Sequence, residues 1–236
     1  MITLTLLNHT RPDNVRHLVS RYLENLQIGE IIVVSSSPGK MAQENWPMLT
    51  GGRVKTVDVA PNMGMYFRWA ASLIAKNQTV IAVDDDLWLP PSTIEGLTKA
   101  VDATPSRLHG LFGRVPTADN KYALCRDTDE TQVPIVCGRV TAFDKKLLPR
   151  FFDAVCCPEW SELYQRAPLD GTRWSNIEDI IFSYAVLAPF PRMAELNHVH
   201  VLPRIELGAP DAISARANHY EYRTEAMRFC QHFFGV

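Results

Sequence analysis

The chain has 236 residues, of which 46% are hydrophobic and 21% charged, a composition typical of a globular protein with a sizeable buried core. Its formal net charge of -2 argues against the broad positive surface with which proteins bind nucleic acid. The sequence contains no run of about 18 apolar residues that would span a membrane, and its first residues lack the basic segment and cleavage site of a signal peptide.

Strand and helix patterns alternate from the first residues onward. β-Branched and other apolar runs predict strands, and apolar residues at helical spacing predict helices, the first of them behind a Pro12-Asp13 start signal. The expected strands are 2–7, 30–37, 53–60 and 79–85, and the expected helices are 13–26 and 63–77. This alternation predicts a Rossmann-like α/β sheet, mostly parallel, with helices on both faces.

The pattern changes after a further helix expected at 91–104. Shorter strand candidates separated by Asp, Asn and Thr residues predict a small antiparallel extension of the sheet. These strand candidates are 109–115, 121–126 and 133–143. Helical spacing returns at 145–155 and 177–187, and an amphipathic helix at 217–234 closes the chain. One domain is expected.

Five cysteines are scattered along the chain, and neither a C-x-x-C pair nor a zinc-site spacing joins them. An odd number of cysteines without such pairing indicates free or buried thiols in a reducing compartment. We therefore expect a cytoplasmic location.

Three consecutive carboxylates, Asp84, Asp85 and Asp86, end the strand expected at 79–85. Three like charges at the end of a buried strand repel one another, so a positive partner is expected there. Alternation along a strand would turn Asp84 and Asp86 to one side and Asp85 to the other. Carboxylate oxygens in this D-x-D pattern suit Mg²⁺ or Mn²⁺. The alternative is a solvated acidic turn.

A second acidic pair, Glu178-Asp179, opens the helix expected at 177–187. One interpretation is that these charges only complement the positive end of the helix dipole, an effect of about 0.3–1 kcal/mol. The other is that one of the two carboxylates acts as a base or holds an acceptor hydroxyl group.

Basic and amide side chains lie near the same expected crevice at the carboxyl ends of the strands. Arg11 follows the first strand and Arg68 lies in the helix before the acidic strand, where their guanidinium groups could bind phosphate. Asn62 stands at the start of that helix, where it could bind a phosphate or simply cap the helix. Ordinary surface arginines are the alternative interpretation.

Histidines near the carboxyl-terminal end of the sequence are weaker candidates. His198 and His200 alternate as on a strand, without a third ligand in view. His219 lies between Arg216 and Arg223, where it could bind a metal or a diphosphate.

These motifs, in this order, resemble the GT-A glycosyltransferases, and more closely the exostosin C-terminal domain family, whose members transfer sugars with retention of configuration. The resemblance covers most of the chain. It is carried by "LTLLNHTRPDNVRHLVSRYL", "EIIVVSSSPGK", "NMGMYFRW", "VIAVDDDLWLP", "GLFGRV", "VPIVCGRVTAFDKKLL" and "NIEDIIFSYAV".

The resemblance implies a single GT-A domain, with a nucleotide-binding half at 1–110 and an acceptor-binding half at 111–236. It further implies a nucleotide-sugar donor with UDP as its nucleotide, a glycan or other hydroxyl acceptor, and Mn²⁺ or Mg²⁺ as cofactor. The implied metal ligands are Asp86, Asp84 and His219; the implied donor-binding residues are Arg11, Asn62, Arg68, Asp84, Asp85, Arg216 and Arg223; and the implied catalytic residues are Asp179 and Glu178.

The sequence also departs from that family. It reads "VVSSSPGK" where exostosin-like proteins carry a Trp-Asn pair, so part of the nucleotide pocket differs. Three alternatives to retaining transfer stay open: an inverting transferase with Glu178 or Asp179 as base, a nucleotidyltransferase, and a non-catalytic module that binds nucleotide sugars or glycans. The absence of a Gly-rich, basic loop after the first strand counts against the nucleotidyltransferase.

Overall fold

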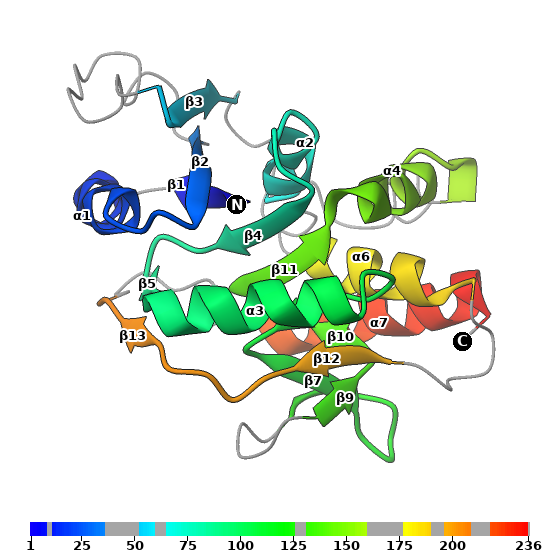
Figure 1. The fold of residues 1–236 in the computed structure, drawn as a ribbon. Helices are drawn as coiled ribbons and strands as arrows, with labels where there is room; N and C mark the ends of the chain where they lie inside the picture. Colours follow the sequence, from blue (N-terminus) through cyan, green and yellow to red (C-terminus); the bar gives the residue numbers. More distant parts are fainter. Residues whose placement is uncertain are drawn as a thin grey trace.

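The computed structural model describes residues 1–8, 11–35, 52–59, 65–125, 131–159, 177–189, 196–208 and 218–235. Its centre is an eight-stranded sheet with the strand order β3-β2-β1-β4-β11-β6-β12-β9 (Figure 1). Two smaller sheets accompany it, with the orders β10-β7-β8 and β13-β5. The structure is therefore mixed α/β, as the alternation predicted.

The first four strands form the parallel part of the sheet. They are β1 (Ile2–Asn8), β2 (Ile28–Ser35), β3 (Val54–Asp58) and β4 (Thr79–Val83). β1 lies between β2 and β4 and is parallel to both. All the residues of β1 and β4 are buried, which is typical of parallel strands covered on both faces. Two helices connect these strands, α1 (Pro12–Leu23) and α2 (Phe67–Ser72).

Among the other strands of the main sheet, β11 and β9 run opposite to β4, whereas β6 and β12 run in the same direction as β4. β11 (Val140–Asp144) pairs antiparallel with β4, and β6 (His109–Gly110) follows it. The other short strands are β5 (Leu87–Trp88), β7 (Gly113–Pro116), β8 (Tyr122–Leu124), β9 (Thr131–Val133), β10 (Ile135–Val136), β12 (Asn197–Val199) and β13 (Ile205–Glu206). The antiparallel extension expected from the turn residues is thus present.

Helices cover both faces of the main sheet. The later ones are α3 (Pro91–Ala103), α4 (Leu148–Val155), α6 (Glu178–Leu187) and α7 (His219–Phe234), with a short 3-10 helix at Lys145–Leu147. Side chains of α1 and α3 pack with Ile81 and Val83 on one face, and side chains of α2, α4, α6 and α7 pack with Val80 and Ala82 on the other. α6 and α7 lie side by side (Figure 1).

Several of the expected elements differ from the structure. Residues 109–115, expected as one strand, form β6 and β7, and residues 133–143 include β10 and most of β11 as separate strands. β4 ends at Val83, so the three aspartates follow the strand, and Asp85 and Asp86 lie in a turn. The alternation expected for a strand therefore does not set the directions of their side chains. α2 spans six residues, fewer than the 63–77 expected, and residues 63 and 64 lie outside the described part of the chain.

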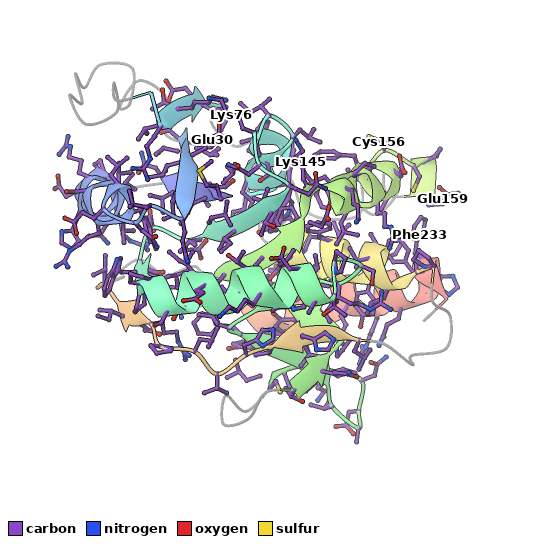
Figure 2. The ribbon with its side chains drawn as sticks, viewed as in Figure 1. Glu30, Lys76, Lys145, Cys156, Glu159 and Phe233 are labelled. Carbon is purple, nitrogen blue, oxygen red and sulfur yellow. The ribbon has the colours of Figure 1, made fainter. Side chains whose placement is uncertain are left out.

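A buried carboxylate, Glu30, lies near the amino end of β2, at the opposite end of the sheet from the three aspartates. Glu30, 2% exposed, accepts hydrogen bonds from Thr3 Oγ1 at 2.8 Å and from the backbone nitrogen of Lys76 at 2.8 Å (Figure 2). Its other oxygen lies 2.7 Å from Lys55 Nζ. These partners lower the pKa of Glu30 against the effect of burial, so its charge joins β1, β2 and β3 to the segment between α2 and β4.

Within the described residues, no helix is long and apolar enough to cross a membrane.

Candidate active site

Asp84, Asp85 and Asp86, called the acidic turn below, lie at the carboxyl end of β4. Backbone contacts from later parts of the chain hold them in place. The backbone nitrogen of Asp84 donates to the carbonyl oxygen of Arg139 at 3.0 Å. The carbonyl oxygen of Asp86 accepts from the backbone nitrogen of Leu207 at 2.7 Å, next to the β5–β13 pair. In α/β sheets this edge is where ligands bind.

Each carboxylate of the turn faces an arginine. Arg11 forms an ion pair with Asp85. Arg68 Nη1 lies 2.9 Å from Asp84 Oδ1. Arg139 Nη2 lies 3.4 Å from Asp86 Oδ1. The positive partners expected for three adjacent carboxylates are therefore side chains of the protein itself.

Arg68 joins the acidic turn to the second acidic pair. Its side chain is 1% exposed, Nη1 donates to the carbonyl oxygen of Gly138, and Nε lies 3.8 Å from Glu178 Oε1. Burial opposes its charge, but Asp84, Glu178 and Asp179 together raise the pKa of Arg68 above its ordinary value. Its Nε and Nη2 have no hydrogen-bond partner within the described residues.

The neighbour of Arg68 explains why that guanidinium is so deeply placed. Trp69 is fully buried, and its ring packs against Phe143 and Phe182 with centroids 5.6 Å and 5.0 Å apart. This aromatic cluster fixes α2 against β11 and α6. Arg68, the residue before Trp69, therefore directs its side chain between Asp84 and Glu178. Trp69 is therefore a core residue.

Glu178 and Asp179 begin α6, which is buried along its whole length. Arg223, from the first turns of α7, donates to Asp179 through Nη2 at 2.8 Å and 2.7 Å from the two carboxylate oxygens. The backbone nitrogen of Gly138 donates to Asp179 Oδ2 at 2.9 Å. A solvated pair that only complements the helix dipole would be exposed, whereas these residues are 3% and 4% exposed.

The two acidic neighbours hold their protons differently. Burial, together with the charge of Asp179, raises the pKa of Glu178 to about 8, and its Oε2 has no hydrogen-bond partner within the described residues. Burial also acts on Asp179, but Arg223 and the Gly138 backbone outweigh it and lower the pKa. At neutral pH the pair therefore consists of a neutral acid and a carboxylate.

Gly138 lies between the two acidic groups, where any larger residue would be tightly packed. Its nitrogen binds Asp179 and its oxygen binds Arg68. A Cβ atom at this position would lie 3.2 Å from Glu178 Oε1 and 3.4 Å from both Arg68 Nη1 and Asp179 Cβ. The backbone of one residue thus links α2 to the start of α6.

The histidine candidates lie in two different places. His219 is the first residue of α7, where burial and the charge of Arg223 lower its pKa to about 4 and keep its ring neutral. His198 and His200 lie at β12 beside His109, whose Nδ1 is 3.2 Å from His200 Nε2. These three rings stack within the sheet.

Two predicted donor-binding residues, Asn62 and Arg216, lie outside the described residues. Arg11, Arg68 and Arg223 lie inside them, each paired with one of the predicted acidic residues.

Comparison with known proteins assigns the chain to a family. The family model of the Glycosyl transferase family 64 domain matches residues 1–236. The chain belongs to glycosyltransferase family 64. The comparison with curated protein sequences found no significant match.

Solved structures similar to this family 64 domain share its fold. One is described as GalNAc-T7 with UDP, GalNAc and Mn²⁺; its TM-score is 0.67 at 9% identity, over 98% of this chain and 48% of that one. Another is residues 1–349 of TarS from S. aureus in complex with UDP-GlcNAc; its TM-score is 0.64 at 12% identity, over 97% of this chain and 65% of that one. The family 64 chain thus spans about half the length of the first and under two thirds of the second, and both are GT-A glycosyltransferases.

The residues of this family 64 domain fit a divalent cation in part. No group of three or more His, Cys, Asp or Glu side chains that could hold a metal is formed within the described residues, so Asp84, Asp86 and His219 do not form such a group. The acidic turn nevertheless offers hard oxygen atoms. Asp84 Oδ1 lies 2.9 Å from Arg68 Nη1, and burial and the charge of Asp86 raise the pKa of Asp84 against the effect of Arg68. Such a set suits Mg²⁺ or Mn²⁺ when phosphates and water supply the other ligands.

Sequence reasoning missed two residues of the site. Arg139 and Gly138 precede β11 in "CGRVTAF", which reads simply as a strand of small residues. The available signal was the Gly-Arg pair directly before a fully buried strand, because glycine permits close approach of the backbone and a charge at that point needs a partner.

Proposed function

We propose that this family 64 protein transfers a hexose or an N-acetylhexosamine from a UDP-sugar to a hydroxyl group of a glycan or glycoconjugate, with retention of configuration and with Mn²⁺ or Mg²⁺ as cofactor. The observation that carries the proposal is a continuous set of contacts between the acidic turn and the second acidic pair. Arg68 contacts Asp84 and Glu178, and the Gly138 backbone binds both Arg68 and Asp179. The titles of the two similar structures, which name UDP or UDP-GlcNAc, support the donor class.

The acidic turn would hold the cation and the donor. Asp86 and Asp84 would bind the cation, with phosphate and water oxygens as the other ligands, and the cation would neutralise the charge of the leaving diphosphate. Arg11, Asp85, Arg223 and the predicted residues Asn62 and Arg216 would contact the nucleotide part of the donor.

The protonation of the second acidic pair favours retention over inversion. An inverting enzyme needs a side chain that accepts a proton from the acceptor hydroxyl. Glu178, with a pKa of about 8, already holds its proton at pH 7, and Asp179 is bound by Arg223, which makes it a weak base. A diphosphate oxygen of the donor would then serve as the base, and Asp179 would position the acceptor or stabilise positive charge on the sugar.

The proposal also includes two predictions made from the sequence, namely that the protein is exostosin-like and that it is cytoplasmic.

A transfer assay tests this function. The protein is incubated with a panel of UDP-sugars and Mn²⁺, Mg²⁺ or chelator, and UDP release is measured with and without sugar acceptors. We expect cation-dependent release with one donor, loss of at least about 100-fold in Asp179→Asn, and no loss in Asp13→Asn, whose side chain is 89% exposed.

Three results would contradict the proposal in different ways. Donor binding without release would indicate a binding module. Full activity in Asp179→Asn would remove the role of the second acidic pair. Inverted anomeric configuration of the product, determined by NMR, would favour the inverting alternative.

A further inference from the structure

The carboxylate of Asp86 already faces a positive charge from the protein. Arg139 Nη2 lies 3.4 Å from Asp86 Oδ1. The backbone of Arg139 is also tied to the same acidic turn, because its carbonyl oxygen accepts a hydrogen bond from the nitrogen of Asp84 at 3.0 Å. The position of this guanidinium is therefore set by the acidic turn itself.

Other groups hold Arg139 at the same place. Its Nη1 lies 3.5 Å from Glu206 Oε1 on β13, and its guanidinium carbon lies 4.7 Å from the centre of the Phe112 ring. Glu206 is part of the β13–β5 pair that follows the acidic turn. Arg139 could therefore leave Asp86 and still keep a carboxylate and an aromatic ring as partners.

The contact with Asp86 is of the kind that a stronger ligand displaces. The distances of 3.4 and 3.5 Å exceed those of a short charge-assisted hydrogen bond, and 29% of the Arg139 side chain is exposed. Partly exposed ion pairs of this type add little to stability. A divalent cation needs an oxygen of the same carboxylate, which is only 11% exposed.

We propose that Arg139 is a built-in counter-ion of Asp86 that competes with the divalent cation for this carboxylate, so that Arg139 sets the metal affinity of the site. The proposal rests on the cation-binding role of Asp86 in the proposed function. Held in place by Glu206 and Phe112, Arg139 neutralises the charge of Asp86 when no cation is bound.

Direct metal binding tests this role without any transfer reaction. The probe is Mn²⁺ alone, and its bound fraction is measured from the electron paramagnetic resonance signal of the free ion. Arg139→Gln removes the positive charge and keeps a polar but shorter side chain, whereas Arg139→Lys keeps the charge. Lys99→Gln makes the same change in net charge on the exposed surface of α3. Circular dichroism and thermal unfolding verify that each variant is folded.

We expect Arg139→Gln to bind Mn²⁺ about tenfold more tightly than wild type, because a unit charge next to the cation is removed. Arg139→Lys should stay close to wild type, Lys99→Gln should be unchanged, and Asp86→Asn should lose binding.

Equal or weaker binding in Arg139→Gln, with binding lost in Asp86→Asn, would overturn the competition while leaving Asp86 as a metal ligand. Unchanged binding in Asp86→Asn would overturn it too, because the cation would then lie elsewhere. Failure of every variant to bind Mn²⁺, also when UDP is added, would remove both this proposal and the metal part of the proposed function. UDP release from a UDP-sugar in the presence of chelator would then test whether the protein transfers sugar without a cation.

Discussion

Replacing Glu178 by glutamine tests whether this buried acid is neutral in the folded protein. The pKa of Glu178 rises from an ordinary 4.5 to about 8 because burial and the charge of Asp179 both oppose ionisation. Between these values the unfolded chain releases a proton that the folded chain keeps, so stability falls as pH rises through that window. Each unit of pH costs about 1.4 kcal/mol, which gives about 3 kcal/mol at pH 7.

Glutamine has nearly the shape of the protonated acid and does not titrate. We therefore expect Glu178→Gln to match wild type near pH 4.5 and to exceed it in free energy of unfolding by about 3 kcal/mol at pH 7. Above pH 8 the difference should stop growing, because Glu178 is then ionised in both states.

Urea unfolding at a series of pH values measures this difference. Glu225→Gln, on the exposed side of α7, is the matched control and should follow wild type throughout. A variant less stable than wild type at pH 7 would refute the reasoning, because it would mean that Glu178 is ionised and that its contact with Arg68, at 3.8 Å, stabilises the fold.

Three further substitutions separate the chemistry of the site from the stability of the fold. Gly138→Ala should reduce kcat by at least about tenfold, because the added carbon lies 3.2 Å from Glu178 Oε1 and overpacking of this kind costs about 1–3 kcal/mol. Steady-state kinetics measure the change: a lower kcat with unchanged KM would support this prediction, and full activity would contradict it. Arg223→Gln should destabilise the protein by about 3–5 kcal/mol, because it leaves the Asp179 carboxylate buried without its partner; thermal unfolding measures this loss, which Arg223→Lys should restore in part. Glu30→Gln should cost about 1–3 kcal/mol at pH 7 with activity kept, and the difference should shrink as pH falls through the lowered pKa of Glu30, where the wild type loses the charge as well.

The parallel half of the fold could be predicted because its signals are local. β1, β2 and β4 are rich in apolar and β-branched residues and almost completely buried, and α1 begins at a proline. The boundaries were less accurate. β4 ends at Val83 because the acidic turn is fixed by Arg139 and Leu207, residues distant in sequence whose contacts no local pattern contains.

The candidate acidic residues could also be found from sequence, but their environment could not. The pattern locates Asp84 and Asp179, and nothing in it shows that Arg68 lies between their two groups or that Arg223 binds Asp179. Those pairings arise where α2, α6 and α7 meet, and they decide which acid keeps its proton. The partners of a charge are a tertiary property, whereas its position at the end of a strand is a local one.

The pairing of arginines with carboxylates explains how the acidic turn can exist in the folded protein, and it also limits how a donor can bind. Arg11, Arg68 and Arg139 each face one aspartate of the turn, so the charges nearly cancel before any ligand arrives. A nucleoside diphosphate would bring further negative charge to this balanced group, and an arginine that turned to the phosphate would leave a carboxylate without its partner. Under the proposed function, donor binding would therefore be favourable only when additional positive charge arrives with it. On this reasoning the affinity for UDP should be low in chelator and should rise with Mn²⁺, and a UDP affinity independent of the cation would mean that the arginines alone balance the diphosphate.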